Sequence, residues 1–265
     1  MSPTRSTPDA LWSAPALSVL RPAAITCTDL RRGRELDGCS LSVPVGARLL
    51  VVSDPDGTAS TLLRALAGLS RVDSGQIRVA GLSDPGRGGW GRHVAYVGPD
   101  PGLHTWMTPI EALHLASDLL DLPSNETSRR IEHAIARVHI PAAAATRPMS
   151  RGGLALQQRT GLAAALISDP EVLLLDEPLR ALDERERTRL LTLPGQRRTI
   201  LLASRYPATE SGLVAHVAFL RDGRVQIFVP VDALERAGLP QSHRGIVALA
   251  EMHATRAPTR GAAPV

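Results

Sequence analysis

Three short segments that are apolar at almost every position constrain the fold of this chain more than any other feature. They are Arg48–Val52, Val172–Leu175 and Thr199–Ala203, and the second leads directly into Asp176 and Glu177. Strands that are apolar throughout are typical of parallel sheets, whose two faces are both buried. Since the carboxyl ends of parallel strands meet at one edge of the sheet, polar residues placed there can form a site. The sequence therefore predicts an α/β fold with a mostly parallel core sheet.

The segments around these strands predict two smaller subdomains and two tails. From about Leu17 to Gly46, apolar and polar residues alternate between turn signals, which predicts an N-terminal antiparallel β-subdomain. Between about residues 105 and 150, apolar residues recur with helical spacing, which predicts a helical insert. Residues 1–16 are predicted to form a disordered tail and residues 241–265 a flexible C-terminal tail, which leaves residues 17–240 as one domain.

The composition of the chain restricts its partners. Its 30 basic and 26 acidic residues are interspersed and leave a net charge of +4, whereas a nucleic-acid site needs a concentrated basic face, so no nucleic-acid partner is expected. All 30 basic residues are arginine, so no site in the chain can use a lysine. No apolar run reaches the roughly eighteen residues that span a bilayer. Cys27 and Cys39 are interpreted as reduced core residues of a cytosolic protein.

One tract is specific enough to indicate a family. Ile167–Arg187 (ISDPEVLLLDEPLRALDERER) resembles the Walker B strand, catalytic glutamate and D-loop of the ABC ATPases, the nucleotide-binding subunits of ABC transporters. Read outward from this tract, Leu17–Gly238 follows the order of the family's elements. The resemblance implies the P-loop NTPase fold of ABC type, with ATP and Mg²⁺ as cofactors. It also implies that Asp176 holds Mg²⁺ through water and that Glu177 is the catalytic residue, which polarises the attacking water.

The phosphate loop is the most altered motif. The family pattern GxxxxGK, followed by Ser or Thr, wraps phosphates with backbone amides and one lysine, but the matching stretch here is SDPDGTAST. Ser53 and Asp56 replace glycines and Ala59 stands at the lysine position, although an alignment with one deletion keeps Gly57 as a loop glycine. Asp54 and Asp56 also place carboxylates beside the site for a polyanion. By position, the resemblance assigns nucleotide contacts to Gly57, Thr58, Ala59, Ser60, Thr61 and Asp176, and Mg²⁺ ligation to Ser60 and Asp176.

Three positions elsewhere also depart from the family. The Q-loop glutamine position falls on Pro99 or its neighbour, and the switch histidine falls on Arg205, which cannot cycle a proton near neutral pH. No aromatic residue lies near Arg31–Gly33, where the family stacks one on adenine.

The signature motif, LSGGQ in the family, has two possible alignments. One places it on Met149–Gly153 (MSRGG), and the other places Gly153, Leu154 and Ala155 on its Ser-Gly-Gly positions. Either alignment alters a helix end that the family presents to the partner's nucleotide, and both remain open.

These departures lead to three hypotheses. The favoured one is an ATP-binding subunit with an impaired site, paired head to tail with a second nucleotide-binding chain in a homo- or heterodimer, where Asp183 of the D-loop would serve. It would act on separate transporter membrane subunits through the helical insert, and would be cytoplasmic, peripheral on the inner face of the cell membrane. The second is a working ATPase that uses Arg64 or Arg205 in place of the lysine. The third is a non-catalytic pseudo-ATPase that acts as a regulatory or interaction partner.

Overall fold

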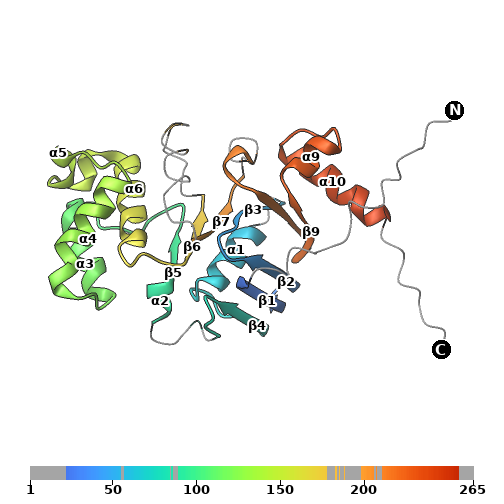
Figure 1. The fold of residues 1–265 in the computed structure, drawn as a ribbon, viewed down its shortest axis with the longest axis horizontal. Helices are drawn as coiled ribbons and strands as arrows, with labels where there is room; N and C mark the ends of the chain where they lie inside the picture. Colours follow the sequence, from blue (N-terminus) through green and yellow to red (C-terminus); the bar gives the residue numbers. More distant parts are fainter. Residues whose placement is uncertain are drawn as a thin grey trace.

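The computed structural model describes residues 22–54, 57–83, 85, 89–177, 183, 185, 188, 198–205, 207 and 211–256. The predicted N-terminal tail, Asp56 and residues 257–265 lie outside this set. Figure 1 shows a group of helices at one end of the molecule, the sheets in the middle, and the last two labelled helices at the other end. No helix among the described residues is both long enough and apolar enough to cross a membrane.

The core sheet has six strands within the described residues. They are β3 (Arg48–Ser53), β5 (Val94–Val97), β6 (Val172–Asp176), β7 (Thr199–Ala203), β8 (His216–Arg221) and β9 (Arg224–Pro230), in the spatial order β5-β6-β7-β3-β8-β9. The first five in this order pair in parallel, and β9 pairs antiparallel with β8 at the edge. Every residue of β6 and β7 is buried, as expected for strands covered on both faces. The predicted mostly parallel core sheet is therefore confirmed.

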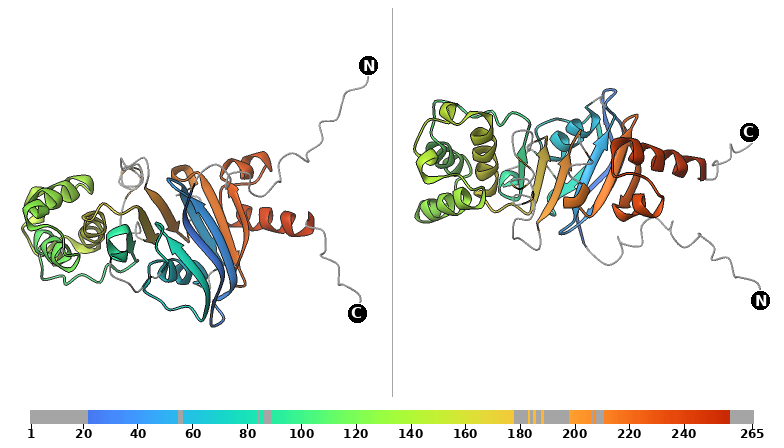
Figure 2. Two further views of the ribbon diagram at one scale, coloured as in Figure 1. Left: turned by 60° about the horizontal axis from the view of Figure 1, so that its bottom comes forward. Right: turned by 90° about the horizontal axis from the view of Figure 1, so that it is seen from above.

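A second sheet, of three antiparallel strands, covers one side of the core sheet. Its strands are β1 (Ala23–Arg32), β2 (Leu36–Pro44) and β4 (Ser74–Val79), in the order β2-β1-β4. Leu62, Leu63 and Leu66 of helix α1 (Thr58–Leu66) are buried in one apolar cluster with residues of both sheets. Figure 2 shows the blue strands of this sheet alongside the core sheet. The predicted N-terminal antiparallel β-subdomain is confirmed.

The helical insert follows β5 and the short helix α2 (Trp90–His93). Its elements are α3 (Pro109–Leu119), α4 (Ser124–Arg137), α5 (Ala142–Ala145) and the 3-10 helix η2 (Met149–Arg151), and α6 (Gly153–Leu166) leads back to the core. Helix α3 begins where the sequence specifies it. The Thr108 hydroxyl accepts from Glu111 N at 3.2 Å, and Glu111 Oε2 accepts from Thr108 N at 2.8 Å, which is a complete capping box. Helices therefore form within the range that the apolar spacing predicts.

Helix α1 begins earlier than its leucine spacing indicates. The spacing predicts a helix over residues 60–69, whereas α1 spans Thr58–Leu66. Gly57 and Gly68 flank it with φ angles of 82° and 76°, both in the left-handed region that favours glycine. A Cβ atom at Gly68 would lie 2.6 Å from the backbone oxygen of Pro85, so the chain turns there in a space that only glycine fits.

The prediction of a flexible C-terminal tail from residue 241 is wrong for residues 243–256. These residues form helix α10 (His243–Arg256), which follows the short 3-10 helix η3 (Ser211–Leu213) and the short helix α9 (Asp232–Arg236) in the chain. Ile246, Leu249 and Ala250 of α10 are 1%, 1% and 6% exposed and belong to the apolar cluster of the core sheet. Their spacing of three and four is helical, and burial against the sheet stabilises a helix whose composition alone gives a weak signal.

Candidate functional site

The carboxyl edge of the core sheet brings together three residues that are far apart in the sequence. Asp176 ends β6, Ser60 lies in the first turn of α1, and Tyr96 lies in β5. The Ser60 hydroxyl donates to Asp176 Oδ1 at 2.8 Å, and the Tyr96 hydroxyl donates to Asp176 Oδ2 at 2.8 Å. Asp176 is 2% exposed, so these two hydroxyls satisfy a buried carboxylate. The two predicted metal ligands, Ser60 and Asp176, are therefore in direct contact.

Tyr96 is a member of this site that the sequence motifs do not identify. Burial, together with the hydrogen bond to the Asp176 carboxylate, raises the pKa of its hydroxyl above the ordinary value. Tyr96 is thus a neutral donor to Asp176 at any physiological pH. Tyr96 lies in the apolar segment Val94–Val97, but only the structure shows that this segment pairs in parallel with β6 and so ends at the same edge.

The loop between β3 and α1 ends at Gly57, which is the N-cap residue of α1. Its φ of 82° is a conformation that glycine adopts without strain, and this agrees with the alignment that keeps Gly57 as a loop glycine. The first turn of α1 contains no acidic residue and Gly57 offers no side-chain cap. The amino end of α1 therefore retains the partial positive charge that favours an anion.

The remaining predicted contacts in α1 offer less to a phosphate than the family pattern does. Thr58, Ala59 and Thr61 are 2%, 7% and 7% exposed. The N–H of Ala59 donates to Ser53 Oγ at 3.3 Å, and the N–H of Thr61 donates to Gly57 O at 3.0 Å. The hydroxyl of Ser53, which replaces the first loop glycine, therefore accepts a hydrogen bond from a backbone amide at the start of the helix.

Arg221 neutralises the first of the two loop carboxylates. Its Nε donates to Asp54 Oδ2 at 3.0 Å, and the two side chains are 33% and 34% exposed. This contact raises the pKa of Arg221 above its ordinary value. His243, the first residue of α10, lies 3.8 Å from Asp54 Oδ1 and 3.2 Å from the backbone oxygen of Ser53, measured from Nε2. The start of the loop is thus bounded by Arg221 of β8 and His243 of α10.

Glu177, the predicted catalytic residue, is held by the residue at the switch-histidine position. Its Oε1 accepts from the backbone N–H of Arg205 at 2.9 Å and lies 3.4 Å from Arg205 Nε. The Glu177 side chain is 12% exposed, whereas that of Arg205 is 79% exposed. Glu177 has a φ of 51°, a strained conformation for a residue with a side chain, and its N–H donates to Ala203 O at 3.1 Å. Two residues at other family motifs are exposed: Pro99, at or beside the Q-loop glutamine position, and Asp183, in the D-loop.

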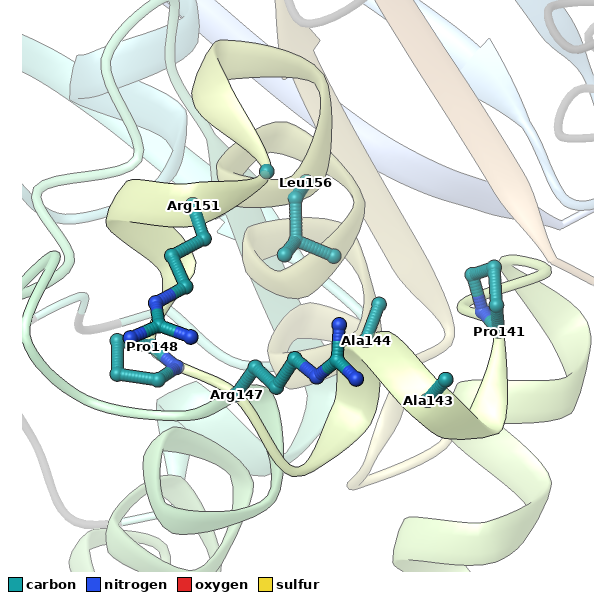
Figure 3. Close-up of a pocket in the computed structure, with 8 residues that line it drawn as sticks. Pro141, Ala143, Ala144, Arg147, Pro148, Arg151 and Leu156 are labelled. Atoms are coloured by element: carbon teal, nitrogen blue, oxygen red, sulfur yellow. The ribbon is translucent and has the colours of Figure 1, made fainter.

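Both signature alignments place the motif at the amino end of α6. Gly152 caps this helix and Gly153 begins it with a φ of 65°. A cavity of about 220 Å³ beside this end is lined by Pro141, Ala143, Ala144, Arg147, Pro148, Arg151, Gly152 and Leu156. Figure 3 shows the side chains of Arg147 and Arg151 among these residues. The two guanidinium groups make this end of α6 electropositive.

These groups fit Mg²⁺ more fully than they fit the nucleotide. Ser60 and Asp176 supply oxygen atoms of the kind that Mg²⁺ prefers, the second through a water molecule as the resemblance implies. Gly57 and the amino end of α1 can contact the phosphates. However, the sequence has no lysine, and the Ala59 amide already donates to the Ser53 hydroxyl. Where the family stacks an aromatic ring on adenine, Arg31 instead bonds to Asp29 and Asp37. The site therefore fits Mg-ATP with fewer contacts than the family pattern provides.

The fold and the site together define a class of protein, the nucleotide-binding cassettes. The defining features are a strand-loop-helix unit opposite an Asp-Glu pair at a strand end, an antiparallel sheet and a helical insert. Comparison with known proteins specifies the family. The sequence model of the family described as "ABC transporter" matches residues 36–180. The aliphatic sulfonates import ATP-binding protein of Corynebacterium glutamicum is 31% identical over 222 residues, which cover 80% of this chain and 86% of that protein. The taurine import ATP-binding protein of Pseudomonas aeruginosa is 30% identical over 242 residues, covering 88% and 90%.

Solved structures agree in fold. The ATP-binding subunit of an ABC transporter superposes with a TM-score of 0.74 at 22% identity, over 86% of this chain and 99% of that one. A dimeric bacterial ABC transporter cassette superposes with a TM-score of 0.69 at 16% identity, over 78% and 98%. The chain belongs to the ABC transporter family and is one of its ATP-binding subunits.

Proposed function

We propose that this subunit binds Mg-ATP weakly at its own site, hydrolyses it slowly or not at all, and serves transport as one of two cassettes. The observation that carries the proposal is the buried contact between Ser60 and Asp176, which keeps the two metal-ligand positions together. Ser60 and Asp176 would hold a bound Mg²⁺, and the ion would supply positive charge that offsets the charge of the phosphates. Gly57 and the amino end of α1 would contact the phosphates.

Two features of the site support its impairment, the absence of a lysine and the hydrogen bond between the Ser53 hydroxyl and the Ala59 amide. Without a lysine at position 59, the phosphates lose a charge-assisted hydrogen bond of about 1.5–3 kcal/mol. Ser53 Oγ also competes with the phosphates for the Ala59 amide. ATP can still bind through the metal and the helix end, but we expect its affinity to be low.

The comparisons support the choice of partners. Two relatives carry the names of import proteins, and a solved neighbour is a dimer. We therefore propose that this chain pairs with a second nucleotide-binding chain, identical or different, and drives import through separate membrane subunits. It would then lie at the inner face of the membrane, with the helical insert (α3 to α5) toward those subunits.

A second candidate is a non-catalytic pseudo-ATPase that regulates or binds other proteins. The observation that favours it is the engagement of Glu177 Oε1 by Arg205, because an oxygen that already accepts a hydrogen bond has less capacity to accept one from the attacking water. The two candidates differ in one measurable property, which is the binding of Mg-ATP.

The test is a titration with Mg-ATP, followed by calorimetry and by thermal unfolding. At one hundred times its Kd, the ligand should stabilise the native state by ~2.7 kcal/mol. Asp176→Asn keeps the size of the side chain but removes its charge, and should abolish the effect. Asp232→Ala, which removes an exposed carboxylate of α9, should retain it. Absence of stabilisation at millimolar Mg-ATP would reject the proposal in favour of the pseudo-ATPase, and rapid turnover that Glu177→Gln abolishes would reject impairment.

A further inference from the structure

The hairpin formed by β8 and β9 places a cation beside the phosphate loop. Arg221 is the last residue of β8, and β8 is the parallel neighbour of β3, so Leu220 pairs with Ser53 in the sheet. Asp54 follows Ser53 directly. Strand pairing thus fixes Arg221 next to the first residue of the loop, although the two residues are 167 positions apart in the sequence.

The Arg221 side chain is held on three sides. Nε donates to Asp54 Oδ2 at 3.0 Å, Nη1 lies 3.6 Å from Glu251 Oε1 of α10, and the guanidinium carbon lies 5.2 Å from the centre of the Phe219 ring. His243 packs edge-on against the same ring at 6.0 Å. A side chain with these contacts is oriented by the fold, unlike a freely solvated surface arginine.

The charge of Asp54 is the reason that this orientation matters. An unpaired carboxylate at the start of the loop would repel a polyphosphate, and two unit charges about 4 Å apart interact by roughly 1–4 kcal/mol. The pairing with Arg221 offsets that charge and keeps the carboxylate directed toward β8.

We infer that Arg221 is a positioning residue of the phosphate loop: it neutralises and orients Asp54, and so allows the loop to admit a polyphosphate in a chain that has no lysine. The inference rests on the proposed function, since it concerns the same nucleotide site. According to this inference, β8 and α10 influence nucleotide affinity, because Arg221 of β8 pairs with Asp54 and Glu251 of α10 helps to hold Arg221.

The experiment is a double-mutant cycle with the full chain, read out as the Kd of Mg-ATP by calorimetry. Arg221→Gln should weaken binding about tenfold, because Asp54 loses its arginine partner. Asp54→Asn in the Arg221→Gln background should restore the wild-type Kd to within about threefold, and Asp54→Asn alone should bind at least as tightly as the wild type. The loss in Arg221→Gln should shrink in high salt, because exposed charges are screened.

Arg224 provides the matched control. It lies in the same hairpin and pairs with an aspartate, through Nη2 and Asp37 Oδ2 at 2.9 Å, but that aspartate is in β2 and not in the loop. Arg224→Gln should leave the Kd unchanged. A general defect of the hairpin would weaken ATP binding in both arginine variants, and rescue by Asp54→Asn would then not occur.

Each outcome decides the inference. Unchanged affinity in Arg221→Gln, or a loss that Asp54→Asn fails to reverse, overturns it while leaving the proposed function intact. Absence of Mg-ATP binding by the wild type overturns both. If Arg221→Gln does not fold, the single variant Asp54→Asn decides, and weaker binding by that variant contradicts the inference.

Discussion

The backbone N–H of Arg205 donates a 2.9 Å hydrogen bond to Oε1 of Glu177, and the Arg205 guanidinium, 3.4 Å away, contributes from a largely exposed position. The first contact uses the backbone amide at position 205, which a substitution of the side chain retains. The second contact requires the arginine side chain itself. The two contributions can therefore be separated by mutation.

Removing the Glu177 carboxylate should cost more stability than removing the Arg205 guanidinium. Glu177→Ala loses the hydrogen bond from the Arg205 N–H to a carboxylate and is expected to cost about 1.5–3 kcal/mol. Arg205→Ala retains that N–H and loses an exposed ion pair, so a change below about 0.5 kcal/mol is expected. Urea unfolding of both variants measures the two values. An equal loss in Arg205→Ala would show that the guanidinium holds the carboxylate.

Tyr96→Phe removes a donor to the buried Asp176 and should destabilise the native state by about 1.5–3 kcal/mol at neutral pH, since the bond is to a charged group. The dependence on pH gives a second readout. The pKa of Tyr96 is raised in the folded state, so its contribution is complete below the ordinary tyrosine pKa of about 10 and declines as the pH rises above that value.

The stability advantage of the wild type over Tyr96→Phe should therefore decrease above pH 10, as measured by urea unfolding across the alkaline range. Because the comparison is between two otherwise identical chains, the titration of other groups cancels. An advantage that stays constant or grows above pH 10 would contradict the raised pKa.

Helix α10 offers a direct measure of how firmly the C-terminal segment is packed. Leu249 is 1% exposed, and Leu249→Ala should cost about 2–5 kcal/mol. Met252 is 39% exposed on the same helix, and Met252→Ala should cost less than about 0.5 kcal/mol. Chemical denaturation of the two variants makes the comparison, and similar small losses in both would restore the interpretation of this segment as a flexible tail.

The sequence predicts those parts of the fold that depend on local pattern. The uniformly apolar segments identify β3, β6 and β7, and the helical spacing of apolar residues identifies the insert. Ser60 and Asp176 could be placed together because the family motifs assign both to one ion, and the structure brings them into contact.

The rest depends on contacts between distant parts of the chain. Tyr96 joins the site through the pairing of β5 with β6, and Arg221 reaches Asp54 through the pairing of β8 with β3. Neither contact leaves a local signal, because an apolar strand does not reveal its neighbours. The same holds for α10, whose few apolar residues stabilise a helix only against the sheet.

The absent lysine gives the sharpest test of why the site is weak. Ala59→Lys places a cation in the first turn of α1, and helical side chains incline toward the amino end, where the phosphates would lie. A charge-assisted contact of about 1.5–3 kcal/mol corresponds to a Kd for Mg-ATP that is lower by roughly 10- to 150-fold. Calorimetry measures the change.

Ala59→Met is the matched control, because it adds a side chain of similar length without a charge. Ala59 is 7% exposed, so either substitution must displace neighbouring atoms, and the methionine variant reports that cost alone. The lysine variant should bind Mg-ATP more tightly than both the wild type and the methionine variant. Equal affinity in the two variants would show that the missing charge does not limit binding, and would direct attention to Ser53, whose hydroxyl occupies the Ala59 amide.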